Sequence, residues 1–165
     1  YENDDNSVFS TAQLKMGSGT SGKLVTEVKR QLTTSPSHAD LAIIDGSPGI
    51  GCPVIASLSG VDFVLIVTEP SVSGISDMER IIHTAEKFKV KTAVCINKYN
   101  TNLQNTELII SYCQKNQLPF VGKIPYDKNA VNTINSGLTI IDVECSSGEA
   151  VKSVYQKTMA QLYGN

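Results

Sequence analysis

The stretch LAIIDGSPGIGCP, residues 41–53, decides the fold expected for this chain. Four apolar residues lead to Asp45, and a turn rich in glycine and proline follows. A short apolar run bounded by turn residues is typical of a strand buried on both faces, as in a parallel sheet covered by helices. A carboxylate at the end of such a strand lies where open α/β sheets bind ligands, and it suits a hydrated Mg²⁺ beside a phosphate chain. The alternative is that Asp45 only caps the following turn.

The rest of the chain alternates between strand and helix patterns. Further strands are predicted at residues 62–68, 92–96 and 120–125, each followed by a turn with glycine, proline or asparagine. Helices are predicted to start at Gly22-Lys23, at Thr101, and at the capping boxes Ser76-x-x-Glu79 and Ser146-x-x-Glu149. A short helix is predicted over residues 54–58, and another is predicted to end at Gly137. This order predicts an α/β fold with a mostly parallel sheet and helices on both faces. The strand at residues 120–125 alternates most, so we place it nearer an edge.

Length and composition bound the class of protein. The 165 residues predict a single domain, 1–165, in which residues 1–7 are loosely ordered. A net charge of −2 without a basic run gives no reason to expect a nucleic-acid surface. The sequence has no long apolar window and no leader, which predicts a cytoplasmic protein. The four cysteines have no metal-site spacing, and Cys95 and Cys113 are expected to be buried thiols.

A glycine-rich segment near the start, GSGTSGKL at residues 17–24, has the spacing of a phosphate-binding loop. However, Leu24 stands where a serine or threonine would reach Mg²⁺, and the preceding residues do not form a convincing buried strand. We therefore interpret Gly22 and Lys23 as the start of an amphipathic helix. Lys23 could meet an anion at that helix N-terminus.

Four motifs occur in a fixed order at the ends of the predicted strands. They are IIDGSPG around Asp45, VTEPSVSG around Pro70, INK at Asn97, and IPYDKNAV with INSG around Asp127. In this order the chain, from about Gly17 onward, resembles the MinD/Mrp/ParA group of P-loop ATPases, especially the members with an inserted ferredoxin module. The resemblance implies a P-loop NTPase-like fold that binds ATP and Mg²⁺.

The resemblance also implies roles for single residues. Asp45 would hold Mg²⁺ through water, and Gly49 would belong to the loop that senses the γ-phosphate. Asn97 would hydrogen-bond the adenine ring, and Pro125 and Asp127 would close over it. From the residues alone, Asn97 could equally cap a turn and Asp127 a helix. No catalytic residue is assigned.

The chain also departs from that family. The family's glycine-rich loop with two lysines and the ferredoxin insert are both missing, and the chain begins with Tyr1. The resemblance therefore implies a truncated, C-terminal part of such an ATPase, with half of an ATP site. We therefore expect poor ATP binding, because backbone N–H groups and a lysine around the phosphates supply most of the affinity. A missing central strand would leave exposed strand edges, which favours a homodimer.

Cys52 follows Asp45 by seven residues, the offset at which the related nitrogenase iron protein has a ligand of a bridging [4Fe-4S] cluster. The alternative is a small residue that packs beneath the turn.

The main functional hypothesis is an ATP-dependent switch with an iron–sulfur or redox client protein. The second is a non-catalytic positioning module of the MinD/ParA type, although a C-terminal tail with only two lysines argues against membrane attachment.

Overall fold

The computed structural model describes residues 21–34, 40–47, 49 and 51–164. The chain divides into two compact units, residues 1–61 and 62–165, which are described separately. The expectation of a single domain over residues 1–165 stays a prediction. The expectation for residues 1–7 lies outside the described residues.

The second unit is built on a parallel sheet. Its strands are β1 (Phe63–Thr68), β2 (Lys91–Asn97) and β3 (Phe120–Ile124), in the order β1-β2-β3. Both pairings are parallel, with Thr68 opposite Ile96 and Asn97 opposite Ile124. The predicted parallel α/β architecture is therefore confirmed, and β3 lies at an edge of the described sheet as its alternation indicated.

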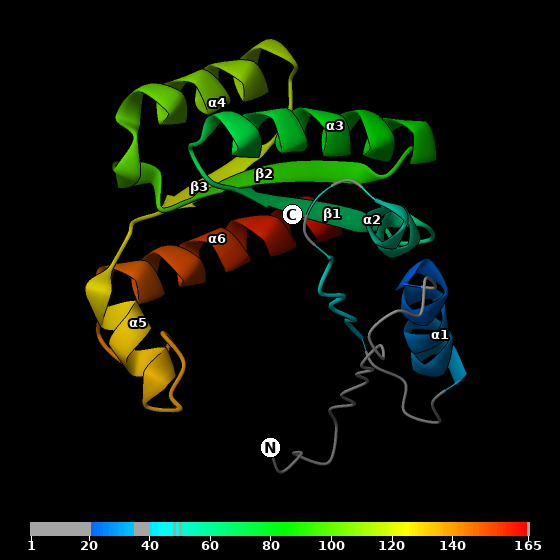
Figure 1. The fold of residues 1–165 in the computed structure, drawn as a ribbon, viewed down its shortest axis with the longest axis horizontal. Helices are drawn as coiled ribbons and strands as arrows, with labels where there is room; N and C mark the ends of the chain where they lie inside the picture. Colours follow the sequence, from blue (N-terminus) through cyan, green and yellow to red (C-terminus); the bar gives the residue numbers. More distant parts are fainter. Residues whose placement is uncertain (1–20, 35–39, 48, 50, 165) are drawn as a thin grey trace. The chain divides into compact units, whose positions relative to one another are not determined.

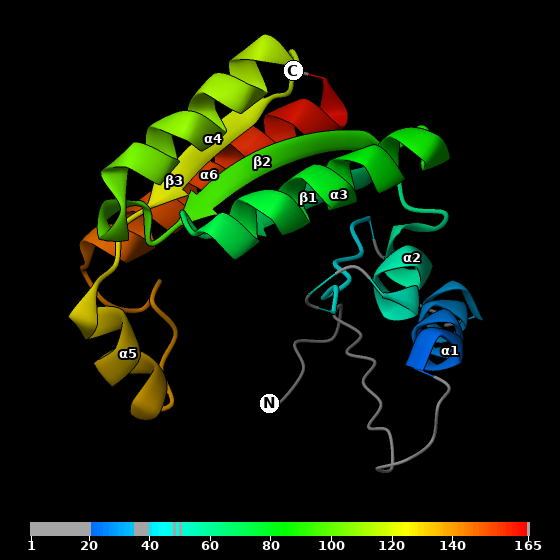
Figure 2. The ribbon, with the colours of Figure 1, turned by 45° about the horizontal axis from the view of Figure 1, so that its top comes forward.

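Helices cover both faces of this sheet, as Figures 1 and 2 show. The helices α3 (Val72–Phe88) and α4 (Leu103–Lys115) lie on one face, and α6 (Ser146–Tyr163) lies on the other. A short helix, α5 (Lys128–Asn135), follows β3. The first face buries a core formed by Ile66, Met78, Ile82, Val94, Ile96, Ile109 and Cys113. The second buries Ala93, Cys95, Val121 and Val154. Since residues alternate between the faces of a strand, β2 contributes to both cores.

The first unit contains the helices α1 (Ser21–Thr34) and α2 (Cys52–Leu58). The predicted helix entry at Gly22-Lys23 is confirmed. The Lys29 ammonium of α1 donates hydrogen bonds to the carbonyls of Ala56 (3.2 Å), Ser57 (3.3 Å) and Ser59 at the end of α2. A cation at a helix C-terminus satisfies carbonyls that have no partner within the helix, so Lys29 ties α1 to α2.

The strand predicted at residues 41–44 is wrong. Residues 41–47 form neither helix nor strand, and Ile43 is 80% exposed. A strand needs a neighbour for its backbone N–H and C=O groups, and no described residue pairs with this segment. The apolar run indicated a capacity for burial but could not supply a partner.

Three helices begin at residues other than those predicted. Ser71 caps α3 through the amide of Gly74 (3.0 Å), five residues before Ser76. Asn102 caps α4, because the hydroxyl of Thr101 donates instead to the Lys98 carbonyl. The sulfur of Cys145 caps α6 and accepts from the amide of Gly148 (3.3 Å). No described helix is long and apolar enough to cross a membrane.

Candidate functional site

The candidate site is the edge of the sheet at which β1, β2 and β3 end. The segments that follow the strands, residues 69–71, 98–102 and 125–127, lie at this edge, which we call the carboxyl rim. Because all three strands are parallel, their carboxyl ends meet there, and open α/β sheets bind ligands at this place. The rim carries three of the predicted site residues, Asn97, Pro125 and Asp127.

Asn97 and Pro125 lie on neighbouring strand ends. Asn97 is the last residue of β2 and is paired with Ile124, which directly precedes Pro125. The Asn97 side chain is half-buried and forms no hydrogen bond with any other described side chain or backbone group. Within the described part of the chain, its amide thus has both a donor and an acceptor without a partner.

The loop after β1 is closely packed against the first turn of α3. The hydroxyl of Thr68 donates to the Gly74 carbonyl (3.0 Å), and the amide of Ser71 donates to the Glu69 carbonyl (2.8 Å). A Cβ at Gly74 would lie only 2.4 Å from that carbonyl oxygen. This loop therefore requires glycine at position 74, which explains the end of the TEPSVSG motif.

The turn after β2 is joined to the loop after β1. Lys98 has a left-handed backbone (φ 52°), and its ammonium lies 2.7 Å from a carboxylate oxygen of Glu69. That carboxylate raises the pKa of Lys98 by hydrogen bonding and by its charge. The Asn105 side chain donates to the Pro70 carbonyl (3.1 Å). These contacts hold two of the three rim segments together.

Asp127 holds the beginnings of two helices. Its Oδ1 accepts from the Asn129 amide (2.9 Å) and so caps α5. Its Oδ2 accepts from the Ser146 hydroxyl (3.1 Å) and from the amide and hydroxyl of Ser147 (3.4 Å each) at the start of α6. The hydrogen bond from the Asn129 amide lowers the pKa of Asp127 most, and the bonds from Ser146 and Ser147 lower it further. Asp127 is therefore a helix cap, the ordinary use noted from sequence, and it links α5 to α6.

The other predicted residues belong to the first unit. Asp45 is exposed, Gly49 has a left-handed backbone (φ +87°), and Cys52 is an exposed free cysteine at the start of α2. A positive φ favours glycine, so the turn requires Gly49 for its conformation.

The donor set limits which cofactors could be held. No group of three or more His, Cys, Asp or Glu side chains gathers among the described residues. A Mg²⁺ ion held by Asp45 would therefore need phosphate oxygens and water to complete its shell, which is how this ion is usually bound. The described part of the chain supplies one exposed thiol, Cys52, whereas a [4Fe-4S] cluster takes four thiolates.

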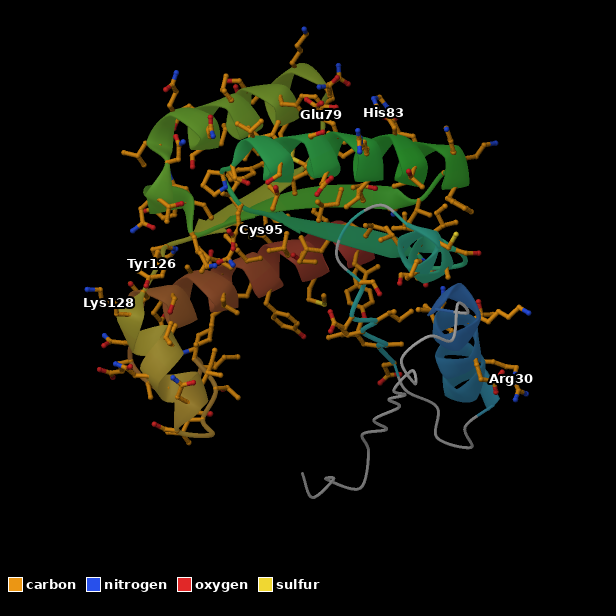
Figure 3. All side chains as sticks on the ribbon, viewed as in Figure 1. Arg30, Glu79, His83, Cys95, Tyr126 and Lys128 are labelled. Carbon is orange, nitrogen blue, oxygen red and sulfur yellow. The ribbon has the colours of Figure 1, made fainter. Side chains whose placement is uncertain are left out.

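Sequence reasoning missed the residues that organise the rim. Asn100 accepts from the amide of Tyr126 through its Oδ1 (2.7 Å), and Lys98 pairs with Glu69 across 29 positions. Figure 3 shows Tyr126 beside the start of α5. The only signal in the sequence was a polar run directly after a buried strand, and that pattern does not say which partners its side chains meet.

Comparisons with known proteins agree on one architecture. No family model matches the chain. An uncharacterized protein of Methanocaldococcus jannaschii is 30% identical over 88% of this chain and 48% of its own length. The septum site-determining protein MinD of Neisseria meningitidis is 26% identical over 85% of this chain and 55% of its own length. The chain thus spans about half the length of the curated relatives it matches.

Solved structures give the same result. The MinD cell division protein of Aquifex aeolicus superposes with a TM-score of 0.67 at 20% identity, over 84% of this chain and 61% of that one. A Borrelia burgdorferi protein described as a plasmid partition protein, bound to AMPPNP, superposes with a TM-score of 0.63 at 14% identity. It covers 81% of this chain and 53% of that chain.

The parallel sheet with helices on both faces defines an α/β fold. More specifically, the chain has the fold of the MinD/ParA-type P-loop ATPases.

Proposed function

We propose that this chain forms part of a nucleotide-binding, ATPase-like domain and that its carboxyl rim receives the base of ATP. The observation that supports this most is the placement of Asn97 beside Pro125 on adjacent parallel strands in a MinD/ParA-type fold. The structural neighbour bound to AMPPNP is itself a complex with an ATP analogue. The Asn97 amide could donate to one ring position of adenine and accept from its amino group.

In this proposal each predicted residue has a stated role. Asn97 reads the base, while Pro125 and Asp127 form the segment that closes over it. Asp45 holds Mg²⁺ through water, and the turn at Gly49 responds to the γ-phosphate. No residue is assigned as general base, and we do not expect this chain alone to hydrolyse ATP.

Mg-ATP should bind this chain weakly, because the sequence lacks the family's glycine-rich loop with two lysines that would surround the phosphates, and Leu24 follows Lys23 where a Mg²⁺ ligand would be needed. The test is an amide NMR titration of the ¹⁵N-labelled chain with Mg-ATP. The amides of residues 97–100, 124, 126 and 127 should shift at millimolar ligand, and Asn97→Ala should remove the preference for ATP over GTP. Asn116→Ala, at the far end of α4, is the matched control.

Two results would contradict this proposal. If no amide resonance of the carboxyl rim shifts at the highest soluble concentration of Mg-ATP, the proposed base site is refuted. A dissociation constant in the low micromolar range would show that the phosphates have a binding site that the sequence does not reveal.

A homodimer is part of the same proposal. The outer edge of β1 is unpaired among the described residues, and its strand FVLIVT contains no charge, proline or glycine that would protect an edge. Val67 on this strand is 56% exposed. Light scattering should give a dimer mass that falls to the monomer in Val67→Lys but not in Val72→Lys, an exposed control on α3. A monomeric wild-type chain would refute this part.

The iron–sulfur role of Cys52 also stays a prediction. Its support is the exposure of this thiol, which leaves it accessible to a cluster shared with a second copy of the chain. Anaerobic reconstitution should give less bound iron in Cys52→Ser than in the wild type. Equal iron content would rule out Cys52 as a cluster ligand and favour the alternative, a positioning module of the MinD/ParA type. The cytoplasmic location is likewise a prediction.

A further inference from the structure

The turn after β2 is held by hydrogen bonds within itself and to α4. Residues 99–101 form a 3₁₀ turn in which the amide (3.0 Å) and hydroxyl (2.8 Å) of Thr101 both donate to the Lys98 carbonyl. The hydroxyl of Thr106, which is fully buried in α4, donates to the Tyr99 carbonyl (2.7 Å). The backbone of Asn100, which lies between these anchors, is therefore held at a fixed place on the rim.

The segment after β3 depends on Asn100 for its position. Pro125 has no amide hydrogen, so the Tyr126 amide is the first donor after the end of β3. That amide donates to Oδ1 of Asn100 at 2.7 Å, a short distance for a bond of this kind. The next residue, Asp127, is anchored on the opposite side by α5 and α6. Pro125 and Tyr126 are thus fixed between two anchors, of which Asn100 is the one on the Asn97 side.

A second contact supports the same arrangement. The Lys123 ammonium of β3 lies 4.6 Å from the centre of the Tyr99 ring, so β3 and the turn after β2 also meet just before Asn100 and Tyr126. The Lys123 contact is made by a flexible chain at the surface. The Asn100 bond is also exposed, but it joins the hydrogen-bonded turn after β2 directly to the backbone of the segment after β3.

We propose that Asn100 is a positioning residue of the nucleotide site: it holds the Pro125–Asp127 segment at the distance from Asn97 that admits the base. This inference rests on the proposed function. It predicts that Asn100 contributes to affinity without touching the ligand, because a loop that is already ordered loses less conformational entropy on binding. Losing one such hydrogen bond should weaken binding roughly fivefold.

The experiment uses the full ¹⁵N-labelled chain with two readouts. Hydrogen exchange at the Tyr126 amide reports the bond itself, and titrations with Mg-ATP and with adenosine report the site. Adenosine is included because it has no charge that a new carboxylate could repel. Asn100→Ala and Asn100→Leu remove the acceptor, whereas Asn100→Asp keeps it. Asn116→Ala is the control, since that residue also makes one side-chain bond to the backbone, with the Tyr112 carbonyl.

We expect faster Tyr126 exchange and roughly fivefold weaker binding in Asn100→Ala and Asn100→Leu. Both properties should be preserved in Asn100→Asp for adenosine and in Asn116→Ala for both ligands. Faster exchange with unchanged affinity would overturn the positioning role while leaving the nucleotide site intact. If neither ligand shifts the rim of the wild type, the proposed function fails and this inference fails with it, whatever the exchange rates.

Discussion

Replacing Gly74 with alanine tests the packing of the rim loop against two opposing effects. Position 74 lies in the first turn of α3, where alanine is favoured over glycine by about 1 kcal/mol from helix propensity alone. The structure predicts the opposite sign. A Cβ there would lie 2.4 Å from the Glu69 carbonyl oxygen, 3.0 Å from Oγ of Ser71 and 3.1 Å from Oγ1 of Thr68.

The size of the effect follows from what must move. The Glu69 carbonyl would have to retreat by about 0.6 Å to reach the 3.0 Å that real Cβ atoms keep, and overpacking of this kind typically costs about 1–3 kcal/mol. The same carbonyl accepts from the Ser71 amide, and Ser71 caps α3, so a shift also weakens a cap that contributes about 1 kcal/mol. After subtracting the propensity gain, Gly74→Ala should destabilise the second unit by about 2 kcal/mol.

Thermal unfolding followed by circular dichroism measures this change. A loss of about 2 kcal/mol should lower the midpoint by roughly 10 °C for a unit of this size. Gly22→Ala is the matched control, because its Cβ would meet only ordinary contacts of 3.5 Å or more near the start of α1. If Gly74→Ala unfolds at or above the wild-type midpoint, the close approach between β1 and α3 is not as described.

Three further predictions concern other charged and thiol groups. Lys29→Met should speed hydrogen exchange of the α2 amides roughly fivefold, because the last carbonyls of α2 lose their donor. The pKa of Asp127 is lowered by folding, so its stabilising effect is present above the ordinary pKa and is lost as pH falls through the lowered one. Calorimetry below about pH 4 should therefore show a smaller fall in midpoint for Asp127→Asn than for the wild type. Alkylation of the native chain should label Cys52 and spare Cys95 and Cys113, because burial raises the pKa of Cys95 to about 11 and also raises that of Cys113. Rapid labelling of Cys95 without unfolding would contradict this.

The parts of the fold that were predictable from sequence are those set by hydrophobic pattern. The runs at residues 62–68 and 92–96 became β1 and β2, and Cys95 and Cys113 are buried as expected. Met78, Ile82 and Ala85 form the buried stripe of α3. Each of these depends on short-range periodicity and on the burial of apolar side chains, both of which can be read from neighbouring residues.

Helix starts were less predictable because several polar side chains compete for the same amides. Ser76-x-x-Glu79 fits a capping box, yet Ser71 takes the cap because Gly74 lets α3 begin close to the end of β1. At α6, Ser146 donates to Asp127 and leaves the cap to Cys145. The outcome depends on contacts between distant segments, which local patterns do not contain.

The candidate site, too, was only partly predictable from sequence. Asn97 and Pro125 could be placed together from sequence, because residues at the ends of adjacent parallel strands must be neighbours. The contacts that fix their separation could not. They run from Asn100 to a backbone amide 26 positions away, and from Asp127 to α6 across 19 positions.

The contrast between β1 and residues 41–44 explains why the predicted first strand did not form. Both segments are apolar, but β1 has a parallel neighbour in β2 and buries Ile66 against α3, whereas residues 41–44 have no described neighbour. On its other face β1 is only partly covered, since Leu65 and Val67 remain 36% and 56% exposed while α6 packs against β2 and β3. An apolar strand with one unpaired edge and one open face has the composition of an interior strand of a parallel sheet. Within the described part of the chain, the unpaired edge of β1 favours association, so we place the interface of the proposed dimer at β1.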